Sequence, residues 1–138
     1  MKLFVDTGAM MALNALGDPY HARAVAFLRG LPAGTRLATS NLVFAETVTL
    51  MAARYGQDAS VRFADGFLSS RLWSVVHYAD EALDRAAVAT MRRFRDKALS
   101  FTDAAVIATV KAEGLDGVFG FDEDFRRCGV ALYPEAFL

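Results

Sequence analysis

Short apolar runs alternate with helical patterns along this chain, and this alternation restricts its fold more than any other feature. The runs suited to buried strands are residues 2–5, 36–39, 72–76, 118–120 and 130–133. Helical patterns occupy the segments between them, from residue 9 onward and at 18–30, 41–55, 60–69, 80–95, 102–113 and 123–127. Strands that alternate with helices form a parallel sheet covered on both faces. The sequence therefore predicts an α/β protein, a three-layer α/β/α sandwich with a central parallel sheet of four to five strands.

The size and composition of the chain are typical of one globular domain. Its 138 residues are enough to bury a core, and we expect a single domain over residues 1–138. Hydrophobic residues make up 54% of the chain, slightly more than usual, which indicates extra apolar surface for a partner. Cys128 is the only cysteine, and no apolar stretch is long enough for a signal peptide or a membrane span. We therefore expect a cytoplasmic protein that does not enter membranes.

Four acidic residues stand where secondary structure is expected to change. Asp6 follows the first strand, and Asp122 follows the run at 118–121. Glu46 and Asp103 lie near the beginnings of two helices. Such places meet at the carboxyl edge of a parallel sheet, where carboxylates repel one another unless a cation neutralises them. The sequence therefore predicts an oxygen-ligand site for Mg²⁺ or Mn²⁺, which is typical of phosphate chemistry.

Three of these residues also have a purely structural interpretation. Asp6 could cap the helix that follows it. Asp103 could cap its own helix, with Ser100 or Thr102 as its partner. Asp122 could form an Asx turn. Independent caps need not all fall at one edge of one sheet, so their common position favours a shared site.

Glu46 is harder to explain as a local structural residue. On its predicted helix it shares a face with Leu42, Val43, Leu50 and Ala53, which we expect to be buried. Carboxylates on a buried face are rare unless they are paired or bind a metal. The alternative to a metal ligand is therefore an ion pair with a buried arginine.

Several stretches of the chain resemble the PIN-domain nucleases, and among them the VapC-type toxins of toxin–antitoxin pairs. The resemblance covers nearly the whole chain and is strongest at residues 4–7, in the helix of Glu46, and at residues 99–104 and 121–125. The order and spacing of Asp6, Glu46, Asp103 and Asp122 match the metal-binding quartet of that family. The resemblance implies a three-layer α/β/α fold and an endoribonuclease that depends on a divalent metal, Mg²⁺ or Mn²⁺.

The resemblance and the residue types together predict roles for individual side chains. The metal-binding and catalytic residues are expected to be Asp6, Glu46, Asp103 and Asp122, with one or two ions among them, and Asp124 is a further candidate ligand. Hydroxyl groups beside them can hold waters or a phosphate oxygen, and the candidates are Thr7, Ser100 and Thr102.

Basic residues gather just before the motif at 99–104. Arg92 and Arg93, followed by Arg95 and Lys97, are placed to bind the phosphates of a substrate. The alternative is a solvated helix end whose cations complement the helix dipole.

One departure from the family pattern is the Gly120–Phe121 pair, which replaces a small polar residue often found beside the last acidic position. It leaves open whether Asp122 or Asp124 is the fourth ligand. The segment Asp18–His21 also looks like a family feature, for which we expect a structural role.

The resemblance implies an RNA substrate, a cognate antitoxin and a homodimer. The alternative is a binding module that keeps the fold and acts through protein contacts without cleaving RNA. Asp6-Thr7-Gly8 also matches the local signature of aspartic proteases, but those enzymes are all-β. A dehalogenase-type phosphatase needs a second Asp where this chain has Gly8.

Overall fold

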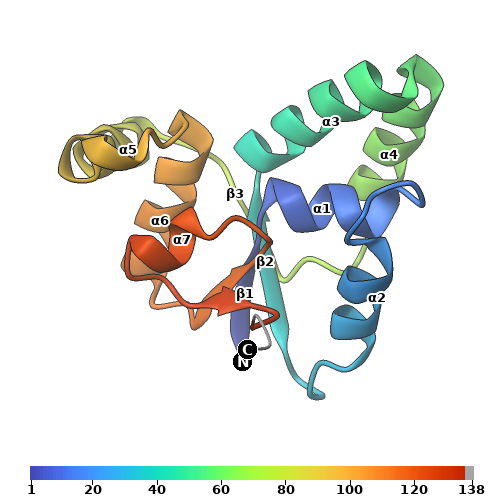
Figure 1. Ribbon diagram of the computed structural model, residues 1–138, viewed down its shortest axis with the longest axis horizontal. Coiled ribbons are helices and arrows are strands. Elements are labelled where there is room, and N and C mark those ends of the chain that lie inside the picture. Colours follow the sequence, from blue (N-terminus) through green and yellow to red (C-terminus); the bar gives the residue numbers. More distant parts are fainter. Residues whose placement is uncertain (136–138) are drawn as a thin grey trace.

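A parallel sheet with helices on both faces forms the molecule (Figure 1). The computed structural model describes residues 1–135. The strands are β1 (Lys2–Val5), β2 (Arg36–Ser40), β3 (Val75–His77), β4 (Gly117–Phe119) and β5 (Leu132–Tyr133). The helices are α1 (Thr7–Asn14), α2 (His21–Arg29), α3 (Asn41–Tyr55), α4 (Gln57–Ser69), α5 (Glu81–Arg93), α6 (Phe101–Glu113) and α7 (Asp124–Arg127), with a 3₁₀ turn, η1, at Arg95–Lys97.

The order of strands in the sheet is β3-β2-β1-β4-β5, and every pairing is parallel. The chain moves outward from β1 through β2 to β3, with α1 to α4 as the connecting helices (Figure 1). It then returns through α5 and α6 to β4 and continues through α7 to β5. Because parallel crossovers are right-handed, reversing the direction puts the second set of helices on the opposite face. Neighbouring strands β1 and β4 therefore form the topological switch point of the sheet, where ligands bind in open α/β folds.

The core lies against β1, the central strand, and its neighbour β4. Leu3, Phe4, Val5, Val118 and Phe119 are fully buried. Strands covered on both faces require continuous apolar runs rather than an alternating pattern, and both runs meet this requirement. The strands that flank the switch point are therefore the best anchored part of the sheet.

The predicted fold class is confirmed: the protein is a three-layer α/β/α structure with a five-stranded parallel sheet. The prediction of one domain over residues 1–138 stays a prediction, and residues 136–138 lie outside the described part of the chain. Within residues 1–135, the structure has no helix that is both long and apolar enough to cross a membrane.

One helix cap and one strand differ from what the sequence favours. Asn41 is a residue type that commonly caps helices, and the sequence favours it as the cap of the helix at 41–55, but Ser40 caps α3, because the Ser40 hydroxyl accepts from the Val43 N–H at 3.2 Å. Asn41 is the first helical residue, and its side-chain oxygen accepts from the Ala79 N–H at 3.2 Å. The third strand, predicted at 72–76, lies at 75–77, where it pairs with residues 38–40 of β2.

Replacing Gly117 with alanine is expected to destabilise the protein. A Cβ at this position would lie 2.5 Å from the Ala131 carbonyl oxygen and 2.9 Å from Tyr133 Cε2, so β4 and β5 would have to separate. The free energy of unfolding should fall by about 1–3 kcal/mol, the usual cost of overpacking. Urea unfolding measures this change.

Gly66 provides the matched control, because a Cβ there would meet no atom within 4 Å. It lies within α4, so Gly66→Ala should leave stability unchanged or raise it by up to about 1 kcal/mol through helix propensity. Equal unfolding free energies for the two variants would contradict the close approach of β4 to β5.

Candidate active site

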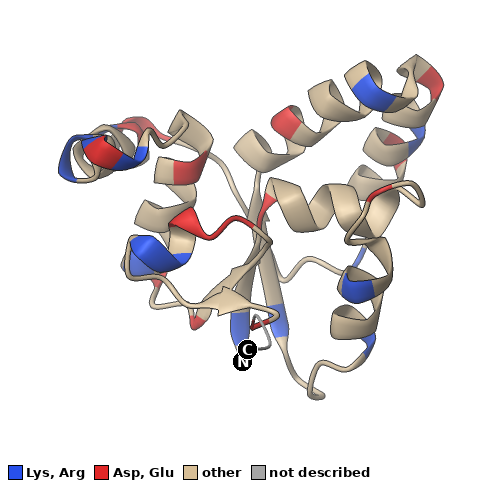
Figure 2. Cartoon of the chain, in the orientation of Figure 1, with Lys and Arg blue, Asp and Glu red and all other residues tan. Residues whose placement is uncertain are grey.

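A pocket of about 380 Å³ opens at the carboxyl ends of the central strands. Acidic positions on α3, on α6 and in the chain between β4 and α7 lie around this end of the sheet (Figure 2). All of the predicted quartet line the pocket, and its lining residues are Asp6, Thr7, Gly8, Met11, Asp18, Pro19, Tyr20, Glu46, Leu50, Arg54, Asp103, Phe121 and Asp122. The tertiary structure therefore brings together four carboxylates from four separate segments.

Asp6 is fixed at the base of this pocket by its backbone. Its N–H extends the β1–β4 ladder by donating to the Phe119 carbonyl at 3.0 Å, and its own carbonyl accepts from the Met10 N–H at 2.9 Å. The residue is only 5% exposed. Within residues 1–135, Asp6 Oδ1 and the neighbouring Thr7 Oγ1 are buried without any hydrogen-bond partner. Asp6 occupies a helix N-cap position, but its side chain makes no cap hydrogen bond. Simple capping therefore does not explain this carboxylate.

The chain after β4 packs against Asp6 at Gly120. A Cβ at Gly120 would stand 3.4 Å from Asp6 Cβ and 3.7 Å from Asp6 Oδ2, which are ordinary van der Waals distances. The segment that leads from β4 to Asp122 therefore begins directly beside the Asp6 carboxylate.

Glu46 projects into the same pocket from the second turn of α3. The expected alternative, an ion pair with a buried arginine, is absent from the described part of the chain, where the four ion pairs all involve other acids. Of the face predicted to be buried, Val43 is fully buried but Ala53 is exposed, because the buried stripe of α3 runs through Val43, Thr47 and Met51. Glu46 is half-buried beside this stripe.

Asp103 and Asp122 each make the local hydrogen bond that their structural interpretation predicted. Asp103 Oδ2 accepts from the Ser100 N–H at 3.2 Å, and the Ser100 hydroxyl accepts from the Asp103 N–H at 3.1 Å, which completes a capping box. Asp122 Oδ1 accepts from the Asp124 N–H at 2.9 Å. Each bond engages one oxygen of the carboxylate and fixes its position. Capping and a role in the pocket are therefore compatible.

Burial and neighbouring negative charges raise the pKa of two carboxylates in the pocket. Burial raises the pKa of Asp6 from an ordinary 3.8 to about 7, against the opposing effect of the Thr7 N–H, and the charges of Asp103 and Glu46 add to the increase. Burial also raises the pKa of Asp103 against its bonds to Ser100, with further contributions from Asp122 and Glu46. The acidic side chains therefore interact across the pocket, and the site favours a bound positive charge.

The residues present fit an oxygen-liganded divalent cation. Asp6 Oδ1 and Thr7 Oγ1 are buried, and no group in residues 1–135 makes a hydrogen bond with either oxygen. A bound cation would provide the missing partner. No three Asp, Glu, His or Cys side chains of those residues are close enough to form a ready-made coordination shell. Mg²⁺ usually keeps several water ligands and takes only one or two carboxylates directly, so a spread set of acids suits it. The candidates to hold it are Asp6, Glu46, Asp103 and Asp122.

Of the remaining predicted site residues, all except Thr7 lie outside the lining of the pocket. Asp124 pairs with Arg127 at 2.9 Å across the single turn of α7, whereas Asp122 lines the pocket. Ser100 holds the capping box, and Thr102 lies half-buried in the first turn of α6. Thr7 is the one predicted hydroxyl residue that lines the pocket.

The predicted substrate-binding arginines, Arg92 and Arg93, lie in the last turn of α5. Arg92 borders a shallow hollow with Glu81, Asp84 and Val88 of the same helix. The Arg93 guanidinium lies 5.1 Å from the centroid of the Phe94 ring. Neither residue lines the acidic pocket, so their part in binding RNA stays a prediction.

Sequence reasoning missed Arg54, the one cationic residue among those that line the pocket. It stands two helical turns after Glu46 on α3, with Leu50 between them. This spacing places all three residues on one face of a helix, and it is the signal that would have found Arg54. Tyr20 and Phe121 were also not assigned to the site, although both line it.

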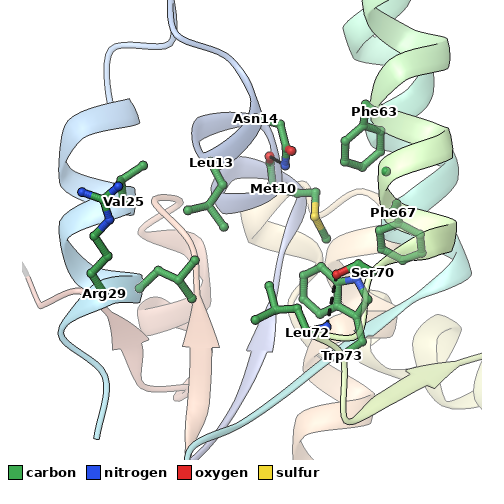
Figure 3. Close-up of a pocket in the computed structure, with 12 residues that line it drawn as sticks. Met10, Leu13, Asn14, Val25, Arg29, Phe63, Phe67, Ser70, Leu72 and Trp73 are labelled. Carbon is green, nitrogen blue, oxygen red and sulfur yellow. Dashed lines mark hydrogen bonds between the residues drawn. The ribbon is translucent and has the colours of Figure 1, made fainter.

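A second cavity, of about 350 Å³, lies among α1, α2 and α4 and has a different chemistry (Figure 3). Side chains of α1, α2 and α4 point into it, and Met10, Phe63, Phe67 and Trp73 form much of its wall. No acidic residue lines this cavity. The acidic pocket is therefore the candidate site for chemistry on phosphates.

Comparison with known proteins identifies the family of this chain. Residues 3–130 match the family model of the PIN domain. The chain belongs to the PIN-domain family. It is 33% identical over 136 residues to "23S rRNA-specific endonuclease VapC20" of Mycobacterium tuberculosis, a match covering 96% of this chain and 99% of the relative. It is 31% identical to a "VapC ribonuclease" of Archaeoglobus fulgidus, a match covering 83% of this chain and 72% of the relative.

Solved structures of PIN domains superpose on this chain over nearly its full length. The crystal structure of Mycobacterium tuberculosis VapC20, described as a "Sarcin-Ricin loop cleaving toxin", has a TM-score of 0.84 and covers 94% of this chain and 96% of its own. Its sequence identity to this PIN domain is 31%. FitAcB of Neisseria gonorrhoeae shares the fold at 20% identity, with a TM-score of 0.70 and 96% of each chain covered. The resemblance to VapC-type PIN domains predicted from the sequence is confirmed.

Replacing Asp6 with asparagine is expected to change how the stability of the metal-free protein depends on pH. The folded-state pKa of Asp6, about 7, is above the ordinary 3.8, so the folded protein binds this proton more tightly than the unfolded chain does. Ionising Asp6 therefore costs stability that grows from about pH 4 to about pH 7 and then stays constant, up to about 4 kcal/mol. Urea unfolding in EDTA should show Asp6→Asn gaining on the wild type over this range.

Exposed Asp65 on α4 gives the control, because Asp65→Asn should follow the wild-type pH profile. Adding Mg²⁺ at neutral pH should reduce the advantage of Asp6→Asn. Parallel pH profiles for the wild type and Asp6→Asn would contradict the burial of an ionisable Asp6.

Proposed function

We propose that this PIN domain is an endoribonuclease that hydrolyses RNA phosphodiester bonds with a divalent cation, Mg²⁺ or Mn²⁺. The observation that carries the proposal is the convergence of Asp6, Glu46, Asp103 and Asp122 on one pocket at the switch point of the sheet. The VapC relatives named as ribonucleases, matched over most of this chain, support it. So does the match of the PIN domain to residues 3–130.

The chain's own residues prepare the pocket for this reaction. When bound, a divalent cation would polarise the scissile phosphate and make a water molecule more acidic. Asp6 follows β1, Glu46 lies on α3, Asp103 lies on α6 and Asp122 follows β4, and each can offer carboxylate oxygens at the pocket. The capping box and the Asx turn hold Asp103 and Asp122 in place before substrate arrives. Arg54, at the same pocket, can bind a phosphate next to the bond that is cut.

The relatives also support a substrate and a biological setting for this proposal. The Mycobacterium tuberculosis relative is named for 23S rRNA, which makes ribosomal RNA the first substrate to test. Its structure is that of a toxin, so we propose that a cognate antitoxin silences this chain in the cytoplasm. Exposed apolar side chains such as Leu68 and Tyr78 suit a homodimer, which is part of the proposal.

The binding-module alternative shares the fold but needs no metal-dependent cleavage. It would be favoured if the purified protein bound RNA or a partner protein and never cut RNA. All positions of the acidic quartet are occupied in this chain, which favours the enzyme.

Removing the charge of Asp6 or of Glu46 is expected to abolish cleavage. Asp6→Asn and Glu46→Gln keep the shape of the side chains and remove the negative charge that holds a cation, so the rate of RNA cleavage should fall at least about 100-fold. Gel assays on isolated ribosomes and on total RNA would measure cleavage, and circular dichroism would confirm folding.

Two controls accompany this test. Asp65→Asn should cut at the wild-type rate, because Asp65 is exposed on α4 and does not line the pocket. EDTA should stop the wild type, and either Mg²⁺ or Mn²⁺ should restore it. Full activity of Asp6→Asn, or cleavage that survives EDTA, would remove the proposed mechanism.

Arg54 and Arg93 make different predictions for substrate binding. If Arg54 contacts a phosphate, Arg54→Ala should raise KM, with kcat changed less. The dependence of log affinity on log salt should become shallower, with the magnitude of its negative slope reduced by about 1. Arg93→Glu should do the same only if α5 also contacts RNA. Arg62→Ala, at an exposed site on α4, is the control. An unchanged salt slope in Arg54→Ala would exclude its phosphate contact.

A further inference from the structure

Two aromatic rings stack against each other at the acidic pocket. The centroids of Tyr20 and Phe121 lie 4.3 Å apart and their planes differ by only 7°. Both residues line the pocket, together with the carboxylates. Tyr20 is still 44% exposed although Phe121 lies against one face of its ring. A large aromatic surface is thus presented to solvent beside the proposed site of chemistry.

The Tyr20 ring is held in place by the loop that precedes α2. Asp18 Oδ1 accepts from the Tyr20 N–H at 2.8 Å, and the Asp18 carbonyl accepts from the His21 N–H at 3.0 Å. His21 Nδ1 lies 2.7 Å from the Ala12 carbonyl, which ties this loop to α1. The segment Asp18–His21 therefore has the structural role expected of it, and one result of that role is to orient Tyr20.

The Phe121 ring is supported from below and from the side. It meets fully buried Phe119 edge to face, with centroids 6.4 Å apart and planes 70° apart. The Arg23 guanidinium lies 5.8 Å from the Phe121 centroid, within the range of a cation–π contact. The rings of Tyr20 and Phe121 thus form a rigid, preorganised surface, which we call the aromatic platform.

We propose that the aromatic platform binds an unpaired RNA base by stacking on Tyr20, next to the phosphodiester held at the carboxylates. The proposal rests on the proposed ribonuclease function and adds a subsite to it. The pocket, about 380 Å³, is at the small end of the range of ligand pockets, about 300–1,000 Å³, which suits a single nucleotide. Stacking on aromatic side chains contributes about 1–3 kcal/mol per base and tolerates any base identity.

This subsite would select RNA structure rather than base identity. A base paired inside a helix is already stacked on both faces and cannot reach Tyr20, whereas a base in a loop or bulge can turn outward. The platform therefore favours cleavage beside unpaired nucleotides. A protein partner that stacked a side chain on Tyr20 would be the rival occupant. RNA is favoured because the platform and the carboxylates share one pocket, so a bound base brings its own phosphate to the acids.

The first test measures stacking without cleavage. In the Asp6→Asn background, single-stranded RNA oligonucleotides carrying one 2-aminopurine at successive positions are titrated with protein, and fluorescence quenching reports stacking. Quenching should be strong at one or two neighbouring positions. Tyr20→Phe should keep it, and Tyr20→Leu should lose it, with affinity reduced about 5- to 140-fold. Equal quenching and affinity in Tyr20→Leu would overturn the platform.

The second test uses the active protein and a substrate that lacks the base. An abasic site at the most strongly quenched position should reduce cleavage by the wild type about as much as Tyr20→Leu reduces it on intact RNA. The two changes together should cost little more than either alone, because both remove the same contact. Independent, additive losses would overturn the proposal. Because Tyr20 is 44% exposed, Tyr20→Phe and Tyr20→Leu should unfold at about the wild-type temperature, and thermal unfolding checks that both variants are folded.

The outcomes separate this inference from the proposed function. Site-specific quenching by a protein that never cuts RNA with Mg²⁺ or Mn²⁺ would overturn the nuclease and leave the platform standing. Metal-dependent cleavage that ignores both Tyr20→Leu and the abasic site would overturn the platform and leave the nuclease standing.

Discussion

Burial of carboxylates beside one another at one edge of the sheet is the constraint on which the rest of this site depends. The β1–β4 ladder carries Asp6 into a position where it is 5% exposed, and the segment after β4 packs against it at Gly120. Water cannot stabilise the Asp6 charge there, and Asp103 and Glu46 oppose it. A bound cation would offset this cost, as would protonation of Asp6, which its raised pKa favours.

Two members of the quartet combine local structure with a place in the pocket. Asp103 closes a capping box with Ser100, and Asp122 closes a turn onto Asp124. Each bond uses one carboxylate oxygen, so the backbone around it is ordered whether or not a cation is bound. Preorganisation of this kind lowers the cost of binding, because the side chains need little rearrangement. The same hydrogen bonds that begin α6 and shape the loop after β4 therefore also position the acids.

The pocket has two walls with different chemistry. On one side, α3 presents Glu46 and Arg54 on a single helical face, so a negative and a positive side chain lie two turns apart. On the other, the loop before α2 and the loop after β4 bring Tyr20 and Phe121 into contact. Charge suits the phosphate of a nucleotide, and an aromatic surface suits its base. The switch point allows both, because the helices that follow β1 and β4 diverge to opposite faces of the sheet.

The sequence by itself determined the strands of the core, the fold class and the positions of the acidic quartet, because apolar runs, caps and helical spacing are set by neighbouring residues. It could not decide between Asp122 and Asp124 as a lining residue, because the Asp124–Arg127 pair depends on where the turn of α7 begins. It favoured Arg92 and Arg93 over Arg54, since a cluster of charges in sequence says nothing about which face of the fold it reaches. Only the tertiary structure placed Tyr20 on Phe121. Contact between segments so far apart depends on strand order, and strand order is decided by the packing of the whole sheet.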